Sequence, residues 1–237
     1  MVYLDDILVY TKGTRREHEK EAAEVLKLLK ENNICLNEKK GEYSKTEVTF
    51  LGTIISREGL RMEPDKTRAI REWPVPKTVK EVQSFLGFAN YYQKFIKNYS
   101  SYTTPLTQLT RKNQQFEWKK LQQEAFEGIK ALFMDETILQ GHDPEKKQTV
   151  ETDASQWAIA AYLSQSDDSR RGKPVAFHSR KLTPAEQNYD IHDKELLAIV
   201  DAFKHWRYYL QGARHEIAIV TDHKNLTTFT TMKTLNK

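Results

Sequence analysis

The chain has 237 residues, enough for two compact domains, and it contains 38% hydrophobic and 30% charged residues. No apolar run approaches the about 20 residues of a membrane-spanning helix, and the first ten residues lack a basic segment, so neither a spanning helix nor a signal peptide is predicted. A single cysteine, Cys35, excludes an internal disulfide framework and a zinc site made of several cysteines, and it indicates a reducing compartment, cytoplasmic or nuclear.

Charge is distributed unevenly along the chain, although the formal net charge is only +4. Residues 64–134 hold 12 lysines and arginines against 6 acidic residues, whereas residues 1–63 and 135–237 each have a net charge of −1. A basic middle segment suits binding to the phosphates of a nucleic acid. A solvated helical surface would give the same composition, and charge alone does not separate these two interpretations.

The N-terminal part of the chain predicts a small α+β region. Residues 1–10 are apolar and β-prone, and Asp5-Asp6 interrupt them in the manner of a hairpin turn. Apolar side chains at helical spacing predict an amphipathic helix over residues 14–31. Residues 47–56 predict one strand, and a turn at residues 57–59 leads into a second strand.

Three prolines then mark a change of organisation, because each disfavours helix in the residue before it. They are Pro64, Pro74 and Pro76. Helical periodicity predicts one helix over residues 77–97 and another over residues 118–134. Both helices fall in the basic segment.

From residue 140 onward the pattern becomes that of an α/β unit. Strands are predicted over residues 148–155, 157–165, 173–182 and 215–223. A helix is predicted over residues 184–209, with Thr183 as its N-cap and Glu186 completing a capping box.

Two adjacent carboxylates, Asp5 and Asp6, lie between apolar strands in the sequence Tyr-x-Asp-Asp. Such a pair is unfavourable unless it stays solvated or binds cations. Hard divalent ions such as Mg²⁺ prefer carboxylate oxygens and substrate phosphates. Neighbouring side chains in a strand face opposite ways, so the pair must lie at a bend to converge. The alternative interpretation is a plain acidic turn.

Three further acids occupy positions where ligands gather in α/β sheets. Asp153 ends one predicted strand, Glu195 lies on the predicted helix, and Asp222 ends the last strand. Carboxylates brought together by strand, helix and strand would hold two Mg²⁺ ions for phosphodiester hydrolysis. Each acid by itself is more often a turn cap or a surface acid.

Eight motifs occur in a fixed order over nearly the whole chain: VYLDDILVY, VTFLGTIIS, VQSFLGFANYYQKFI, FEWKKLQQEAF, ETDAS, PVAFHSRKL, KELLAIV and TDHKNL. Together they resemble the polymerase–ribonuclease H segment of the Pol polyprotein of gypsy-type LTR retrotransposons. The resemblance implies an α+β chain in three parts. These are the C-terminal part of a reverse transcriptase palm (1–63), a helical thumb with connecting helices (64–139), and an α/β ribonuclease H-like domain with a mixed sheet (140–237).

The resemblance also implies roles for individual residues. Asp5 and Asp6 match the catalytic, metal-binding pair of the polymerase palm, and Tyr3 would lie beside the growing primer end. Further nucleic-acid-binding positions implied by the resemblance are Phe50, Leu51, Gly52, Lys80, Lys94 and Lys97. The catalytic, metal-binding acids implied for the ribonuclease H domain are Asp153, Glu195 and Asp222.

Aromatic and histidine side chains keep alternative interpretations. Tyr91, Tyr92 and Phe95 could stack on nucleic acid or form the thumb core, and their spacing favours the core. His223 could orient water or a phosphate, or it could be structural. The histidines that match no ligand role are His178, His192 and His205.

The function implied by the resemblance is RNA-directed DNA synthesis and two-metal hydrolysis of RNA in RNA–DNA hybrids, with Mg²⁺ as cofactor and Mn²⁺ as a substitute. The implied partners are RNA–DNA hybrid, DNA duplex and the other parts of the same polyprotein, with no membrane. The sequence starts at the palm motif and ends before the final helix and fourth acid of relatives, so weak or absent activity is expected of this chain. The alternative is a catalytically inactive nucleic-acid-binding or interaction module derived from such an element.

Overall fold

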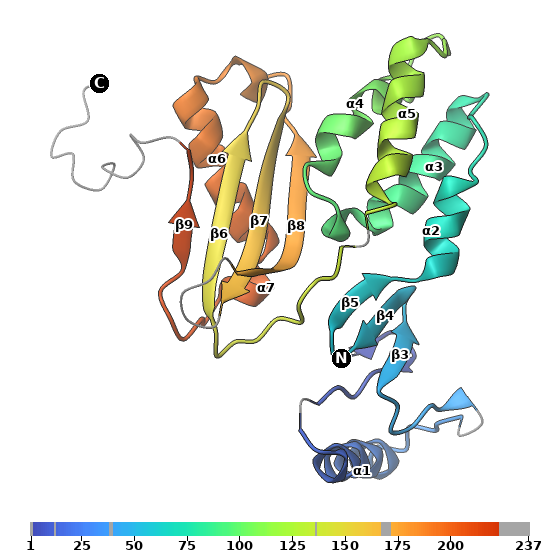
Figure 1. The fold of residues 1–237 in the computed structure, drawn as a ribbon, viewed down its shortest axis with the longest axis vertical. Helices are drawn as coiled ribbons and strands as arrows, with labels where there is room; N and C mark the ends of the chain where they lie inside the picture. Colours follow the sequence, from blue (N-terminus) through green and yellow to red (C-terminus); the bar gives the residue numbers. More distant parts are fainter. Residues whose placement is uncertain (1, 12, 38–39, 136, 167–171, 223–237) are drawn as a thin grey trace, which may run out of the picture. The chain divides into compact units, whose positions relative to one another are not determined.

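The computed structural model describes residues 2–11, 13–37, 40–135, 137–166 and 172–222. The chain divides into two compact units, Met1–Glu63 and Pro64–Lys237 (Figure 1). Both units mix helices with β-sheet, and the larger sheet contains parallel and antiparallel pairs. The expected α+β fold with a mixed sheet is therefore confirmed.

The first unit begins with a short hairpin of β1 (Val2–Tyr3) and β2 (Asp6–Ile7), which pair antiparallel. The predicted amphipathic helix is confirmed as α1 (Arg15–Glu31). Its N-cap residue Thr14 and Glu17 form a capping box, so the sequence itself defines where the helix starts. No residue of α1 is buried among the described residues, so its apolar side chains are only partly covered.

The prediction of a single strand over residues 47–56 was wrong, because this segment forms two strands joined by a turn. The strands β3 (Glu47–Phe50), β4 (Thr53–Ser56) and β5 (Gly59–Met62) form an antiparallel sheet in this order. Leu51 and Gly52 have φ angles of +50° and +68°. Two consecutive residues with positive φ make the two-residue turn that matches strand twist, so the chain reverses inside an uninterrupted apolar pattern.

The second unit starts with a group of packed helices. They are α2 (Pro64–Arg71), α3 (Val79–Tyr91), the 3₁₀ helix η2 (Gln93–Phe95), α4 (Tyr99–Leu109) and α5 (Lys120–Leu132). The helix predicted over residues 118–134 is confirmed as α5. The helix predicted over residues 77–97 ends early at Tyr91, because Tyr92 caps it and the chain tightens into η2. Aromatic rings fill the helical core, with Phe85 and Phe126 centroids 4.7 Å apart.

Helix α4 was not predicted, because serine, threonine and an internal proline, Pro105, make its sequence a poor helix former. Its hydroxyl groups bond to carbonyls of the same helix, as in the 2.8 Å bond from Thr107 Oγ1 to the Thr103 oxygen. One side of α4 is buried, including Tyr99 and Leu106. Tertiary packing therefore stabilises this helix despite its low intrinsic propensity.

The larger sheet has the strand order β8-β7-β6-β9, and Figure 1 shows these strands side by side with α6 behind them. The strands are β6 (Lys147–Ala154), β7 (Ala158–Ser166), β8 (Lys173–Lys181) and β9 (Ala218–Val220). Neighbours pair antiparallel except β6 and β9, which are parallel. Val150, Leu163 and Trp206 are almost fully buried between the sheet and the helices α6 (Ile191–His205) and α7 (Arg207–Leu210). All four predicted strands are present, but the last, predicted over residues 215–223, is limited to Ala218–Val220, and residue 223 lies outside the described residues.

The helix predicted over residues 184–209 starts later than expected. Thr183 and Glu186 do form the reciprocal hydrogen bonds of a capping box, but they cap the 3₁₀ turn η3 (Glu186–Asn188). The helix itself begins at Ile191, after the N-cap Asp190. The capping motif was correctly recognised, and only the tertiary structure shows that it belongs to a separate short turn.

Helix α4 packs on the edge strand β8, on the face of the sheet opposite α6. The buried serines Ser100 and Ser179 bond reciprocally there: Ser100 N donates to Ser179 Oγ at 2.9 Å, and Ser100 Oγ donates to the Ser179 carbonyl at 2.8 Å. Lys181 Nζ adds a 2.5 Å bond to Thr107 Oγ1. These bonds join the helices and the sheet into one unit.

Replacing Ser179 by alanine is expected to destabilise the second unit by about 1–3 kcal/mol, because the buried Ser100 N–H loses its acceptor. Urea unfolding followed by tryptophan fluorescence measures the change. Ser101→Ala, on the exposed side of α4, is the matched control and should change stability by less than about 0.5 kcal/mol. Equal stability of the two variants would show that the Ser100–Ser179 bonds contribute nothing to the junction.

Candidate active site

The parallel pairing of β6 and β9 brings two acids to the same edge of the sheet. Glu151 lies opposite Val220 in the register, so Asp153 and Asp222 each follow two residues later along neighbouring strands. Because side chains alternate along a strand, Asp153 also faces the same side as Glu151, away from α6. Both aspartates are exposed.

Glu195 reaches the same place from the second turn of α6. Its side chain is 2% exposed, and its carboxylate accepts hydrogen bonds from Ala154 N at 3.1 Å and Thr221 Oγ1 at 3.3 Å. One carboxylate oxygen of each acid lies within 4.8 Å of those of the others. The structure therefore brings together Asp153, Glu195 and Asp222, as the order of strands and helix in the sequence suggested.

The electrostatics of this group suit a bound cation. Burial raises the pKa of Glu195, and the negative charges of Asp222 and Asp153 raise it further, while the bond from Ala154 N opposes the shift. Among the described residues, no Lys, Arg or His nitrogen lies within 4.0 Å of the Glu195 carboxylate. A buried carboxylate beside two others, with no protein cation paired to it, matches the oxygen-rich donor sets of hard divalent metals.

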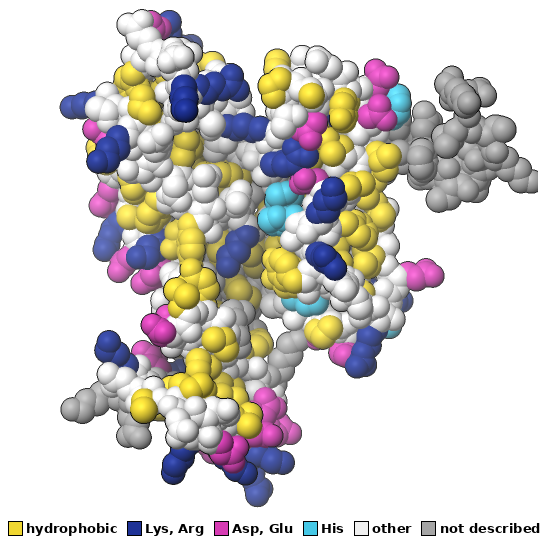
Figure 2. Space-filling view, turned by 180° about the vertical axis from the view of Figure 1, so that it is seen from behind, with side chains coloured by type: hydrophobic (Ala, Val, Ile, Leu, Met, Phe, Trp, Pro, Cys, Tyr) yellow, Lys and Arg dark blue, Asp and Glu magenta, His cyan; other side chains and the backbone are white. Residues whose placement is uncertain are grey.

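A network of charged side chains holds α6 on the sheet. Asp201 on α6 accepts hydrogen bonds from His178 Nε2 at 2.8 Å and Arg180 Nε at 2.7 Å, both on β8. Arg180 also bonds to both carboxylate oxygens of Glu186, at 2.8 and 3.0 Å. The His178 ring stacks on His205, with centroids 3.7 Å apart. Seen from the side on which α6 lies, histidine side chains are flanked by acidic and basic ones (Figure 2).

Burial by itself would raise the pKa of Asp201, but hydrogen bonds from His178 and Arg180 outweigh it and lower this pKa to about 2. The histidines that matched no ligand role thus include one, His178, that helps to hold the helix carrying Glu195. The network supports the active site from behind the sheet and makes no contact with the three acids in the described geometry.

Asp201→Asn is expected to lower the free energy of unfolding at pH 7 by about 1–3 kcal/mol, because His178 and Arg180 bond to different carboxylate oxygens and the amide replaces one of these acceptors with an NH₂ donor. The folded pKa of about 2 lies below the ordinary value of 3.8, so the carboxylate stabilises the fold above pH 4, and this contribution is lost as the pH falls toward 2. Chemical unfolding at several pH values should show the two proteins converging at low pH. A difference independent of pH would contradict the assignment.

An open cleft of about 440 Å³ lies on the face of the sheet opposite α6. Its acidic end contains Asp153 and Asp222 together with Glu151. Lys97 and Asn98, which precede α4, also line it. The remaining lining residues are Thr152, Ala160, Ala161, Tyr162, Val220 and Thr221.

Sequence reasoning missed several members of this site. Thr221 and the Ala154 N–H hold Glu195, and Glu151 and Asn98 line the cleft. Glu151 was detectable in principle, because it precedes Asp153 by two residues on a strand and must share its face. His223 lies outside the described residues.

In the first unit, Leu4 and Asp5 form the turn of the β1–β2 hairpin, where Leu4 has a φ of +49°, and Asp6 begins β2 directly after it. The bend required for two adjacent carboxylates to converge is thus present. Both acids are exposed, and Tyr3 is 54% exposed. Phe50 ends β3, and Leu51-Gly52 form the turn that follows it.

The lysines assigned to the thumb lie at three separate places in the second unit. Lys80 is in the first turn of α3, Lys94 is in η2 with its ammonium 5.2 Å from the Phe95 ring centroid, and Lys97 follows η2. All three are exposed. The preferred core interpretation of the nearby aromatic residues is confirmed for Tyr92 and Phe95, which are 3% and 1% exposed, and is wrong for Tyr91, which is 55% exposed.

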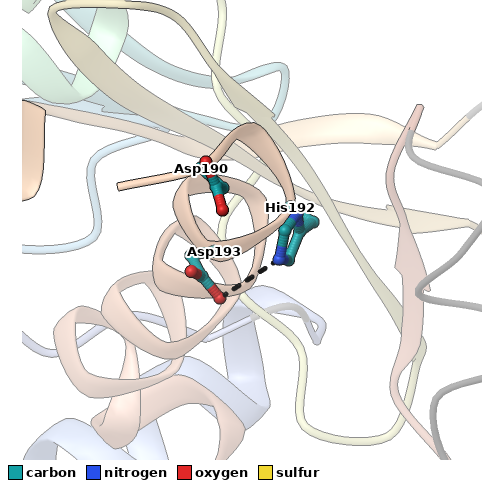
Figure 3. Close-up of side chains that lie close together, drawn as sticks. All are labelled: Asp190, His192 and Asp193. Carbon is teal, nitrogen blue, oxygen red and sulfur yellow. Dashed lines mark ion pairs between the residues drawn. The ribbon is translucent and has the colours of Figure 1, made fainter. Parts of the chain in front are cut away.

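A second acidic group lies at the start of α6 (Figure 3). Its members are Asp190, His192 and Asp193, all exposed, with His192 Nε2 3.8 Å from Asp193 Oδ1. These three residues are close in sequence and face solvent, so their proximity is a local consequence of the helix start.

The two units match two known protein families. Residues 1–55 match the family of reverse transcriptases (RNA-dependent DNA polymerases), and residues 118–219 match the RNase H-like domain found in reverse transcriptase. The helices of the described residues include none that is both long and apolar enough to cross a membrane.

The chain is similar over 94% of its length to transposon polyproteins of Schizosaccharomyces pombe. It is 39% identical to the Tf2-3 and Tf2-7 polyproteins, and it spans only 17% of their length. Among solved structures, foamy viral protease–reverse transcriptase in complex with RNA/DNA hybrid matches with a TM-score of 0.75 and 25% identity, covering 96% of this chain and 31% of that one. The same viral enzyme with double-stranded DNA gives a TM-score of 0.74, covering 95% of this chain and 47% of that one.

Fold, acid site and sequence similarity together define a piece of a reverse transcriptase joined to a ribonuclease H-like domain. The chain thus contains a reverse transcriptase segment and an RNase H-like domain of the kind found in reverse transcriptase, and it is similar to the corresponding segment of retrotransposon polyproteins. The family and the fold class expected from the eight motifs are therefore confirmed.

Proposed function

We propose that Asp153, Glu195 and Asp222 form a hydrolytic site for the RNA strand of RNA–DNA hybrids, with Mg²⁺ as the cofactor. The observation that carries this proposal is that one oxygen of each of the three carboxylates lies within 4.8 Å of those of the others, and that two of the acids, Asp153 and Asp222, line an open cleft. The similarity to a viral reverse transcriptase solved with RNA/DNA hybrid supports the choice of substrate.

Each acid of this site has a distinct structural role. Glu195 is held by Ala154 N and Thr221, so its carboxylate does not turn away from the other two. Asp153 and Asp222 are exposed and open directly into the cleft. A divalent cation bound by these oxygens supplies positive charge to an attacking water and to the departing oxygen of a phosphodiester. The protein residues orient the carboxylates and leave one side of the site open to a nucleic-acid backbone.

Mg²⁺ is expected to stabilise the chain, because it relieves repulsion among three neighbouring carboxylates. At a concentration about tenfold above the dissociation constant, the melting temperature should rise by about 3–6 °C, and chelation should reverse the rise. In Glu195→Gln the rise should disappear, and the metal-free variant should melt higher than the metal-free parent. An unchanged Mg²⁺ response in this variant would remove Glu195 from the metal site.

Hydrolysis of a labelled RNA–DNA hybrid should require all three acids. Asp153→Asn, Glu195→Gln and Asp222→Asn are each expected to lower the cleavage rate by about a hundredfold or more, because each removes a charged metal ligand. Asp193→Asn is the matched control, since Asp193 lies on the same helix two residues before Glu195 and is exposed. Mn²⁺ should substitute for Mg²⁺. If the parent binds hybrid but cleaves none with either metal, the alternative function, an inactive nucleic-acid-binding module, is favoured.

A second function, RNA-directed DNA synthesis, is favoured by the β1–β2 hairpin, which places Asp5 and Asp6 at a bend as a metal-binding pair requires. In this assignment Tyr3 and the Phe50–Gly52 turn contact the primer, and Lys80, Lys94 and Lys97 contact phosphates of the duplex.

The boundaries proposed for the parts are residues 1–63 for the palm segment, 64–139 for the thumb and connecting helices, and 140–237 for the ribonuclease H-like domain. Primer extension by a polyprotein carrying Asp5→Asn tests the catalytic pair.

The proposed partners are RNA–DNA hybrid, DNA duplex and the remaining parts of the polyprotein. The proposed location is the cytoplasm or the nucleus, which agrees with the single exposed cysteine, Cys35.

A further inference from the structure

The cleft that contains the acids is built from two different parts of the second unit. The strands β6 and β7, with the end of β9 and the two residues after it, contribute the acidic end and the floor, whereas Lys97 and Asn98 come from the segment between η2 and α4. A site made from the sheet alone would contain only acidic and neutral side chains. The helical part adds a positive charge to the same cleft.

Lys97 is available to bind an anion. Its side chain is exposed, and within the part of the chain that the structure describes its ammonium makes no ion pair or hydrogen bond. Other lysines nearby are engaged: Lys181 donates to Thr107 Oγ1, and Lys94 lies over the Phe95 ring. Glu151 lines the same cleft, but its carboxylate lies more than 4.0 Å from Lys97.

The backbone of Lys97 is held firmly in place on both sides. Phe95 and Ile96 before it are 1% and 4% exposed, and Tyr99 after it is 2% exposed. Ser100 is bonded to Ser179 on β8, so the segment is fixed to the sheet that carries Asp153. The position of the lysine Cα relative to the acids is therefore determined by packing, and only its flexible side chain moves.

The floor between the two charged ends is suited to a sugar–phosphate backbone. Ala160 lies opposite Asp153 in the strand register, and Tyr162 lies opposite Glu151. Alanine leaves room above the sheet, and the Tyr162 ring is stacked on Phe177 with centroids 5.2 Å apart. Because Lys97, Asp153 and Asp222 line the same cleft, a backbone lying in it would pass both the acids and the lysine.

We infer that Lys97 is a positioning residue of the hydrolytic site, which binds a phosphate next to the scissile one on the cleaved RNA strand. This inference rests on the proposed hydrolytic function and deepens it, because it makes the helical part contribute to substrate placement in the ribonuclease H-like site. Lys97 then acts in the cleft of the sheet, in addition to any contact with duplex held by the thumb.

The first test measures hybrid binding in the catalytically blocked Glu195→Gln chain. Lys97→Gln added to this background should weaken binding of an RNA–DNA hybrid about tenfold and reduce the slope of log affinity against log salt by about 0.9. Lys204→Gln is the matched control, because Lys204 is exposed on α6, which covers the other face of the sheet. Binding and salt slope equal to those of the control would overturn the inference.

The second test locates the phosphate. A chain carrying Cys35→Ser and Lys97→Cys is cross-linked to hybrids whose RNA strand holds, at one known position, a phosphorothioate on a 2′-O-methyl nucleotide alkylated with a linker that ends in a bromoacetamide. The introduced thiolate displaces bromide from this linker and forms a thioether. Cross-linking confined to one or two phosphates beside the cleavage position supports the inference, whereas even cross-linking along the strand, or none at any position, overturns it. Thermal stability should not change, because Lys97 is exposed.

The two proposals fail in different ways. In the active chain, Lys97→Gln should raise KM for hybrid about tenfold and leave kcat within about twofold, because Lys97 acts on substrate placement. If the parent chain cleaves nothing but Lys97→Gln still weakens binding and the cross-link maps to one site, the hydrolytic function fails and the phosphate site stands. If cleavage is normal and Lys97→Gln has no effect on KM, the hydrolytic function stands and Lys97 has no role in it.

Discussion

The candidate site depends on one interaction, the parallel pairing of β6 with β9. This pairing sets Glu151 opposite Val220, and it is the reason that Asp153 and Asp222, nearly seventy residues apart in the chain, end at the same edge. A shift of one residue would turn one aspartate to the opposite face, because side chains alternate along a strand. Strand β6 also pairs with β7 on its other side, so the register of the central strand defines both the acidic edge and the floor of the cleft.

Bringing three carboxylates together is unfavourable in the absence of cations. Ion pairs on the other side of the sheet stabilise the fold against this repulsion. Glu195 is almost fully buried beside two like charges, and within the described part of the chain its donors are the Ala154 amide and the Thr221 hydroxyl. On the other side of the sheet, Asp201 is paired with His178 and Arg180, and Arg180 is paired with Glu186. Charge repulsion at the site and charge pairing behind it thus act on the same helix, α6, with opposite effects on stability.

The helices of the second unit have a structural and a chemical connection to the sheet. Structurally, the two serines of α4 and β8 satisfy each other's buried polar groups. Chemically, the same segment of chain leads Lys97 into the cleft. The helical part and the α/β part are therefore linked by a packed junction, which gives a physical basis for treating them as one structural unit.

The sequence by itself determined the local features whose signals lie within a few residues: the capped helix α1, the four strands of the larger sheet, and the identity of the acids at strand ends. Its apolar pattern continues through Leu51-Gly52, so the turn there was implied only by the resemblance to relatives and not by the residue pattern. Helix α4 was not predicted, because packing rather than propensity stabilises it. The tertiary structure alone decided that Thr221 and Ala154 hold Glu195 and that Lys97 shares its cleft with Asp153. The physical reason is that these relations depend on strand register and helix docking, which arise from contacts between residues far apart in the chain.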